Sequence, residues 1–217
     1  MKKQEKKKPI NWTKVSIVGI CVLFAFAMVA TYLSPIVGSM RTIKPNESVL
    51  ADITVRDSMG TPLVTTDSQV FANSPPQSFL LRNPMTLKAG GMSTDLTSLD
   101  AYNRNLGSVL FTFHQLELDE MNAAIIGMRS GETKNVKFDF TTPLELEFNV
   151  SAEYFDAIGG NFTIAEPGDW FTMGYGTNET DLSAYRPATI KEKTDSYLVI
   201  SSKYTSVDIT IKSIGNQ

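Results

Sequence analysis

The side chains that most often catalyse reactions or bind metals are scarce in this sequence. It contains one Cys and one His, so a disulfide framework and a Cys/His zinc site are both excluded. The sequence identifies no acid or base partner for His114, which we interpret as an ordinary strand or surface residue. Glu145 and Glu147 are two residues apart on an expected strand and share one face, which indicates a solvated surface rather than a catalytic pair. We expect no metal site and no cofactor.

Charge is unevenly distributed along the chain. Six of its 20 Lys+Arg and one of its 23 Asp+Glu lie in residues 1–14, so the remainder of the chain is acidic. An acidic body argues against nucleic-acid binding, which needs a basic surface to displace counterions. The sequence has no Gly-rich phosphate loop and no Gly-x-Ser-x-Gly elbow, so the common nucleotide and hydrolase chemistries lack their signatures.

The uncharged run Val15–Leu33 predicts a membrane-spanning helix. As a helix it extends ~28 Å, close to the ~30 Å thickness of the hydrocarbon core. We place a transmembrane anchor at residues 15–37, between a basic tail (1–14) and a linker (38–46). The lysines of the tail predict a cytoplasmic N-terminus by the positive-inside rule. The expected location is therefore the cell membrane, crossed once, with the body outside the cell.

Two other interpretations of this segment stay open. Ala25-Phe26-Ala27 has the small-x-small form of a signal-peptide cleavage site, although it lies inside the apolar run. A buried core helix is a further option. Cys21 falls inside the segment, where a small apolar filler is the simplest interpretation.

The body contains four Asn-x-Ser/Thr sequons, which are candidate glycosylation sites. They are Asn46, Asn149, Asn161 and Asn178. An excess of sequons fits an exported surface, and accidental sequons in a sequence rich in Ser and Thr explain them equally well.

Hydrophobic periodicity predicts mostly antiparallel strands and one short helix. Alternation with a period of two predicts the strands: residues 49–56, 135–140, 144–150, 185–193, 197–201 and 207–211. Met121, Ala124, Ile125 and Met128 recur at helical spacing and predict a short helix over about 119–126. Residues 66–110 follow neither pattern, and we expect a long, partly ordered insertion there. The predicted fold class is α+β.

The segment Ala124–Glu132 resembles the FKBP-type peptidyl-prolyl cis-trans isomerase family. In that family a short helix ends in a Gly-Met-x-x-Gly-Glu turn that leads into a strand, and the same string begins here at Gly127. Val49–Leu63, with a turn at Gly60, is similar to the opening strands of that family. Val207–Ile211 resembles its last strand.

Residues 151–204 resemble the flap insert of the SlyD-like branch of that family, most clearly at Arg186-Pro-Ala-Thr-Ile-Lys-Glu192. The resemblance implies an FKBP-like antiparallel half-barrel sheet around one short helix, formed by residues 47–150 and 205–217. It implies that residues 151–204 are an inserted, mostly-β flap domain. Residues 66–110 would then be an additional insertion.

The resemblance also implies a substrate pocket. The family rotates X-Pro peptide bonds, whose barrier comes from amide resonance, and a dry apolar pocket can favour the twisted amide over the planar one. The matching pocket positions are Ile53, Leu63, Val64, Leu118, Met121, Leu144 and Val207. Ile53 replaces a Tyr of the family, and Pro143-Leu144-Glu145 replaces its Ala-Tyr-Gly signature. Ordinary core packing is the simpler interpretation of Ile53, Met121 and Val207.

We therefore expect a membrane-anchored peptidyl-prolyl isomerase and chaperone that assists folding of exported proteins. Its partners would be unfolded polypeptides with proline-containing or apolar segments. One alternative, favoured by the altered pocket positions, is a catalytically inactive FKBP-like ectodomain that acts as an envelope binding or scaffolding module. Another is an unrelated all-β surface protein in which the Gly-Met-x-x-Gly-Glu string is a coincidence.

Overall fold

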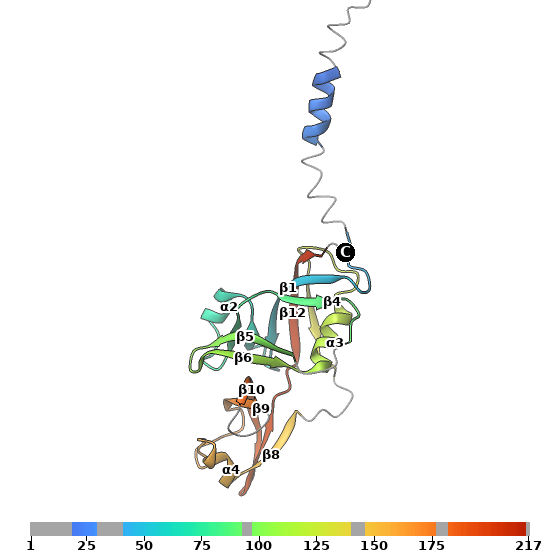
Figure 1. Ribbon diagram of the computed structural model, residues 1–217. Helices are drawn as coiled ribbons and strands as arrows, with labels where there is room; N and C mark the ends of the chain where they lie inside the picture. The colour runs from blue at the N-terminus through green and yellow to red at the C-terminus, as the bar shows by residue number, and fades with distance from the viewer. Residues whose placement is uncertain (1–18, 30–40, 93–96, 140–145, 177–181, 216–217) are drawn as a thin grey trace, which may run out of the picture. The chain divides into compact units, whose positions relative to one another are not determined.

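The computed structural model of the protein describes residues 19–29, 41–92, 97–139, 146–176 and 182–215 (Figure 1). The chain divides into two compact units, Met1–Arg41 and Thr42–Gln217. In the first unit residues 19–29 are helical and exposed, and residues 15–18 and 30–37 of the expected anchor lie outside the described residues.

The structure does not support the transmembrane helix that the predicted fold included. Within the ranges that it describes, no helix is long and apolar enough to cross a membrane. The described helical residues, 19–29, rise about 16 Å at 1.5 Å per residue, against a hydrocarbon core of ~30 Å, and the residues on either side of them lie outside the described ranges.

The described residues of the second unit are mostly β. They form twelve strands and three short helices. The helices are α2 (Ser68–Ala72), α3 (Gln115–Ala124) and α4 (Ala152–Ala157). The strands are β1 (Ser48–Arg56), β2 (Pro62–Thr65), β3 (Phe79–Leu81), β4 (Met85–Lys88), β5 (Thr97–Asn103), β6 (Gly107–Phe113), β7 (Thr133–Lys137), β8 (Glu147–Ser151), β9 (Trp170–Gly176), β10 (Leu182–Lys193), β11 (Tyr197–Ser201) and β12 (Ser206–Ile214).

The predicted α+β class is therefore wrong, because the described residues are mostly β, and the strands of the expected flap domain belong to the main sheet. A half-barrel sheet is present, but it is larger than expected. Ten strands follow one continuous path in a curled, half-barrel sheet, in the order β7-β12-β1-β2-β3-β5-β6-β10-β11-β8. Strand β4 pairs with β1, and β9 pairs with β10. Strands β10, β11 and β8 extend the same sheet that contains β1 and β12, in the lower part of Figure 1.

Much of the unexpected sheet comes from the stretch that showed no periodicity. Residues 66–110 contain α2, strands β3 to β5 and the start of β6. All of these strands belong to the sheet. The alternation in β5 is hidden because a polar residue faces inward there. Asn103 is fully buried, and its Nδ2 donates to the carbonyl oxygens of Ser78 (3.0 Å) and Pro76 (3.3 Å). Side-chain hydrogen bonds of this kind make an inward polar residue tolerable.

Two separate groups of buried residues hold the second unit together. The main core lies between the curled sheet and α3, and includes Ile53, Phe111 and Met121. A smaller core around Phe155 and Leu198 joins α4 to the β9–β10–β11 strands. The α3 helix is tied to the end of β4, because Asn122 Oδ1 accepts a hydrogen bond from the Lys88 N–H (3.0 Å). It ends before Gly127, whose φ of +82° suits glycine.

Candidate functional site

The structure brings six of the seven predicted pocket residues together in the main core. Ile53, Leu63, Val64, Leu118, Met121 and Val207 are all buried, with exposed fractions of 4% or less. Leu144 lies outside the described residues. Close packing of this kind leaves these side chains covered by neighbours, and none of the six lines the groove described below.

The remaining predicted positions are on the surface or outside the described ranges. Asn46, Asn149 and Asn161 are exposed, which a glycan would require, and Asn178 is not among the described residues. Glu147 is exposed in β8 and lines the groove, whereas Glu145 lies outside the described part of the chain.

An open groove of about 660 Å³ lies on the described part of the second unit. Its lining includes the turn after β1 (57–59), the end of β7 with the residue that follows it (137–138), and the segment before β12 (203–205). Residues 167–168, Trp170 and residues 189–191 also line it, and Glu147 and Ser201 complete the lining. Volumes of 300–1,000 Å³ are typical of ligand-binding clefts.

Aromatic and flexible apolar side chains contribute to the lining of the groove. Trp170 and Phe138 are partly buried and pack against the main core. Met59, at the tip of the β1–β2 turn, is 76% exposed. A long, unbranched Met side chain can adapt its shape to different apolar partners.

Charged residues at the groove include more lysines than carboxylates. Lys137 and Lys191 are exposed. Lys203 Nζ lies 3.3 Å from Glu147 Oε1, so these two charges form an ion pair across the lining. Asp57 is buried, and its Oδ1 accepts hydrogen bonds from the N–H groups of Met59 (2.8 Å) and Thr61 (2.7 Å). The groove is thus slightly basic on a body that is acidic overall.

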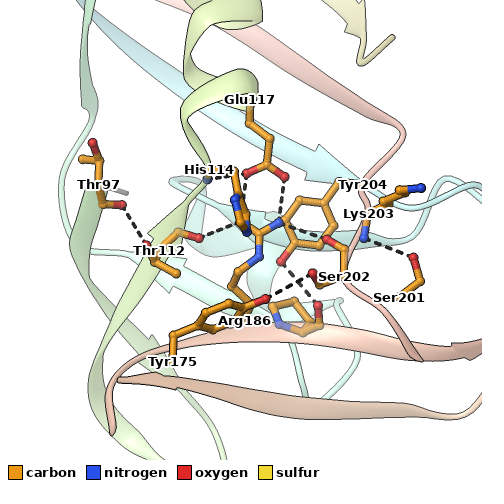
Figure 2. Close-up of polar contacts among 11 residues, drawn as sticks. Thr97, Thr112, His114, Glu117, Tyr175, Arg186, Ser201, Ser202, Lys203 and Tyr204 are labelled. Atoms are coloured by element: carbon orange, nitrogen blue, oxygen red, sulfur yellow. Dashed lines mark hydrogen bonds and ion pairs between the residues drawn. The ribbon is translucent and has the colours of Figure 1, made fainter. Parts of the chain in front are cut away.

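A second polar cluster is fully buried beside the groove, around Arg186 of β10 (Figure 2). Arg186 Nη2 donates to Glu117 Oε1 (2.7 Å) and Nη1 donates to Glu117 Oε2 (2.8 Å), so the ion pair is bidentate. The same two nitrogens also donate to the carbonyl oxygens of Thr112 (2.8 Å) and Ser202 (3.0 Å). The guanidinium lies 4.4 Å from the centre of the Tyr204 ring, within cation–π range.

The cluster fixes the protonation of its members. Burial works to lower the pKa of Arg186, and the Glu117 carboxylate overrides it, so the pKa of Arg186 is raised and the side chain stays charged. Burial raises the pKa of the Tyr204 hydroxyl. Burial, helped by the nearby Arg186 charge, lowers the pKa of His114 to about 4, so its imidazole is neutral near pH 7.

These properties make the Arg186 cluster a structural connection rather than an active site. Both side chains of the pair are fully buried, and their carboxylate oxygens and terminal guanidinium nitrogens are occupied by hydrogen bonds within the protein. The cluster joins the first turn of α3 to β10, elements whose paired residues are 69 positions apart in sequence. Sequence reasoning missed it, because the only signal was Arg186 in the segment that resembles the flap insert. His114 is half-buried before α3 rather than in a strand.

Comparison with known proteins does not place the chain in a family. No family model matches it, and no curated protein matches it. The resemblance to FKBP-type isomerases therefore stays a prediction that depends on the motifs quoted above. Among the residues that the structure describes, no three His, Cys, Asp or Glu side chains are grouped so as to hold a metal ion.

Proposed function

We propose that this protein is a chaperone-like polypeptide-binding protein that holds proline-containing or apolar segments of other chains in the groove beside Trp170. The observation that carries this proposal is the groove itself. It is open, of ligand-binding size and lined in part by apolar side chains, whereas the six predicted isomerase pocket positions that the structure describes are filled core residues. Binding to an open groove needs no pocket among the core residues.

The composition of the groove supports polypeptide rather than small-molecule recognition. Its lining combines turns and strand ends with residues 189–191 of β10, and Met59 and Trp170 contribute apolar side chains to this open groove. Extended segments with proline commonly bind grooves lined by aromatic side chains, because little conformational entropy is lost on binding. The lysines at the groove favour segments without strong positive charge.

We also propose that the protein acts outside the cell. The basic tail and the sequons favour a body outside the cell, where unfolded exported chains would be its partners. The exposure of Asn46, Asn149 and Asn161 is compatible with this location.

The proposal is tested with the fluorescence of Trp170. The chain has two tryptophans, so the full-length W12F variant leaves Trp170 as the only one. Titration with reduced, carboxymethylated ribonuclease A, which stays unfolded and contains no tryptophan, should change the Trp170 emission in a saturable way, and native ribonuclease A should not. If neither protein alters the emission and neither co-sediments with the chain, the proposal is wrong.

A further inference from the structure

Strand β8 is an open edge of the sheet. It ends the continuous path of strands and pairs only with β11 among the described strands (Figure 1). At one end of this pair the Ser202 N–H donates to the Leu146 carbonyl oxygen (2.9 Å), and at the other the Ala152 N–H donates to the Ser196 carbonyl oxygen (2.9 Å). Antiparallel pairing alternates along a strand, so the even-numbered residues of β8 bond to β11 and the backbone groups of its odd-numbered residues point away from it.

These outward groups are available to a further strand. They belong to Glu147, Asn149 and Ser151, which are all exposed. Within the described ranges, the outward N–H and C=O groups of Glu147 and Asn149 have no hydrogen-bond partner. A row of such groups is a template for pairing with another chain.

The two ends of the sheet differ in how they are protected against such pairing. Strand β7, at the other end, carries the exposed residues Lys134 and Lys137, and lysines on an edge strand discourage pairing between chains. Strand β8 carries no lysine, arginine or proline. Its single charge, on Glu147, is already paired with Lys203 (3.3 Å). The β8 edge therefore lacks the features that keep another strand away.

The sequence of β8 is complementary to a second copy of itself. In an antiparallel pair centred on Asn149, which uses the whole length of the strand, Asn149 lies opposite the partner's Asn149 and Glu147 lies opposite the partner's Ser151. Amide then meets amide and carboxylate meets hydroxyl, so no like charges face each other. On the other face of the strand, half-buried Phe148 lies opposite the partner's Val150, and both are apolar.

Exposed aromatic side chains flank the same edge. Tyr197 of β11 is 38% exposed and lies opposite Ser151 in the β8–β11 pair. Tyr154 is 45% exposed, and its N–H donates to Ser151 Oγ (3.2 Å). Apolar surface is thus available next to the edge, in addition to its backbone groups.

We propose that this protein forms a two-fold symmetric dimer in which the β8 strands of two copies pair antiparallel about Asn149 and join the two sheets into one. The inference is independent of polypeptide binding in the groove. It requires the sequon at Asn149 to carry no glycan in the dimer, because a glycan there would separate the two copies.

Cysteine cross-linking tests the pairing. Hydrogen-bonded residues that face each other have Cα atoms about 5.5 Å apart, which is within disulfide range. The full-length C21S chain, which lacks the only native Cys, is kept in a mild detergent that dissolves the apolar run at 15–33. In this background N149C should form a disulfide-linked dimer on oxidation with copper–phenanthroline.

The matched control is N135C, in the same C21S background. Asn135 is exposed and its backbone groups point outward from β7, the lysine-protected edge. It should cross-link about tenfold more slowly than N149C, because only random collision brings two such residues together.

A pair of charged variants tests the position of the two-fold axis. N149K and N149D each place like charges opposite one another, and each should weaken dimerisation about tenfold or more in sedimentation velocity. An equimolar mixture of the two should restore the dimer, because opposite charges then face each other. The N135K and N135D variants, with the same charge changes on β7, should dimerise as the unmodified protein does.

A full chain that stays monomeric, equal cross-linking of N149C and N135C, or a dimer that N149K and N149D both leave unchanged would overturn this inference. Circular dichroism checks that each variant is folded. If N149C is not folded, the mixture of N149K and N149D decides the matter. None of these results depends on the groove, so this inference and the proposed function fail separately.

Discussion

The ion pair between Arg186 and Glu117 shows at the scale of single residues how charges are accommodated inside this protein. Both side chains are completely buried, yet both carboxylate oxygens and both terminal guanidinium nitrogens have partners. The arrangement compensates the desolvation of two charges only while both partners are present. A change to one partner should therefore cost more than a change to both.

We expect E117Q and R186M each to lower the free energy of unfolding by about 3–5 kcal/mol, because each leaves the other partner buried without its counter-charge. The E117Q/R186M double variant should lose much less than the sum of the two single losses. Urea unfolding followed by circular dichroism measures all three. Additive losses, or single losses under about 0.5 kcal/mol, would contradict the description of this pair as coupled.

His114 gives the stability of the protein a pH dependence. Its folded-state pKa of about 4 lies below its ordinary value of 6.5, so between these values the unfolded chain binds more protons than the folded one. Stability should therefore fall as the pH drops from about 6.5 towards 4. An H114Q variant should show a flatter profile over this range in urea unfolding. If the free energy of unfolding of H114Q falls with pH as steeply as that of the unmodified protein, groups other than His114 cause the pH dependence.

At the scale of elements, α4 depends on a close approach of glycine to an aromatic ring. A Cβ placed on Gly160 would lie 2.5 Å from two ring carbons of Phe155, which belongs to the smaller core. We expect G160A to destabilise the protein by about 1–3 kcal/mol through overpacking. I158S, at an exposed position of the same segment, should change the unfolding free energy by less than about 0.5 kcal/mol. Equal losses in the two variants would refute this explanation.

The sequence predicted the elements whose inward residues are apolar and missed those whose inward residues are polar. Strand β1 alternates between buried and more exposed residues from Ser48 to Ile53, and Met121 and Ile125 are buried as the helical spacing required. The observed α3, Gln115–Ala124, begins earlier than expected, because Glu117 accepts a hydrogen bond from the His114 N–H (2.9 Å) and supports a start at that point. Strand β5 was missed because Asn103 faces inward.

The candidate site was less predictable than the fold. The groove is assembled from segments that are far apart in sequence, such as the turn at 57–59 and residues 189–191. No local pattern links such segments, and only the sheet topology brings them together. The buried Arg186 pair was hidden for the same reason, since a charged residue in a strand gives no sign that its partner lies on a distant helix.

At the scale of the whole molecule, the packing of the main core bears on catalysis. Ile53, Met121 and Val207 are almost completely buried, so a prolyl bond has no access to a dry pocket at these positions. We expect the full chain to leave the isomerisation rate of succinyl-Ala-Leu-Pro-Phe-p-nitroanilide at its spontaneous value in a protease-coupled assay. A rate that rises in proportion to protein concentration would contradict this and favour the isomerase that the resemblance implies.

The central claim, that unfolded polypeptides bind in the groove beside Trp170, is tested most directly by comparing two exposed methionines. Met59 lines the groove and is 76% exposed, whereas Met92 is 88% exposed and lies outside it. In the full-length W12F chain, M59S should weaken binding of reduced, carboxymethylated ribonuclease A about tenfold, the loss expected for one Met side chain that becomes buried. M92S should leave the dissociation constant unchanged. Equal affinities in M59S, M92S and the parent chain would contradict the assignment of the groove as the binding site.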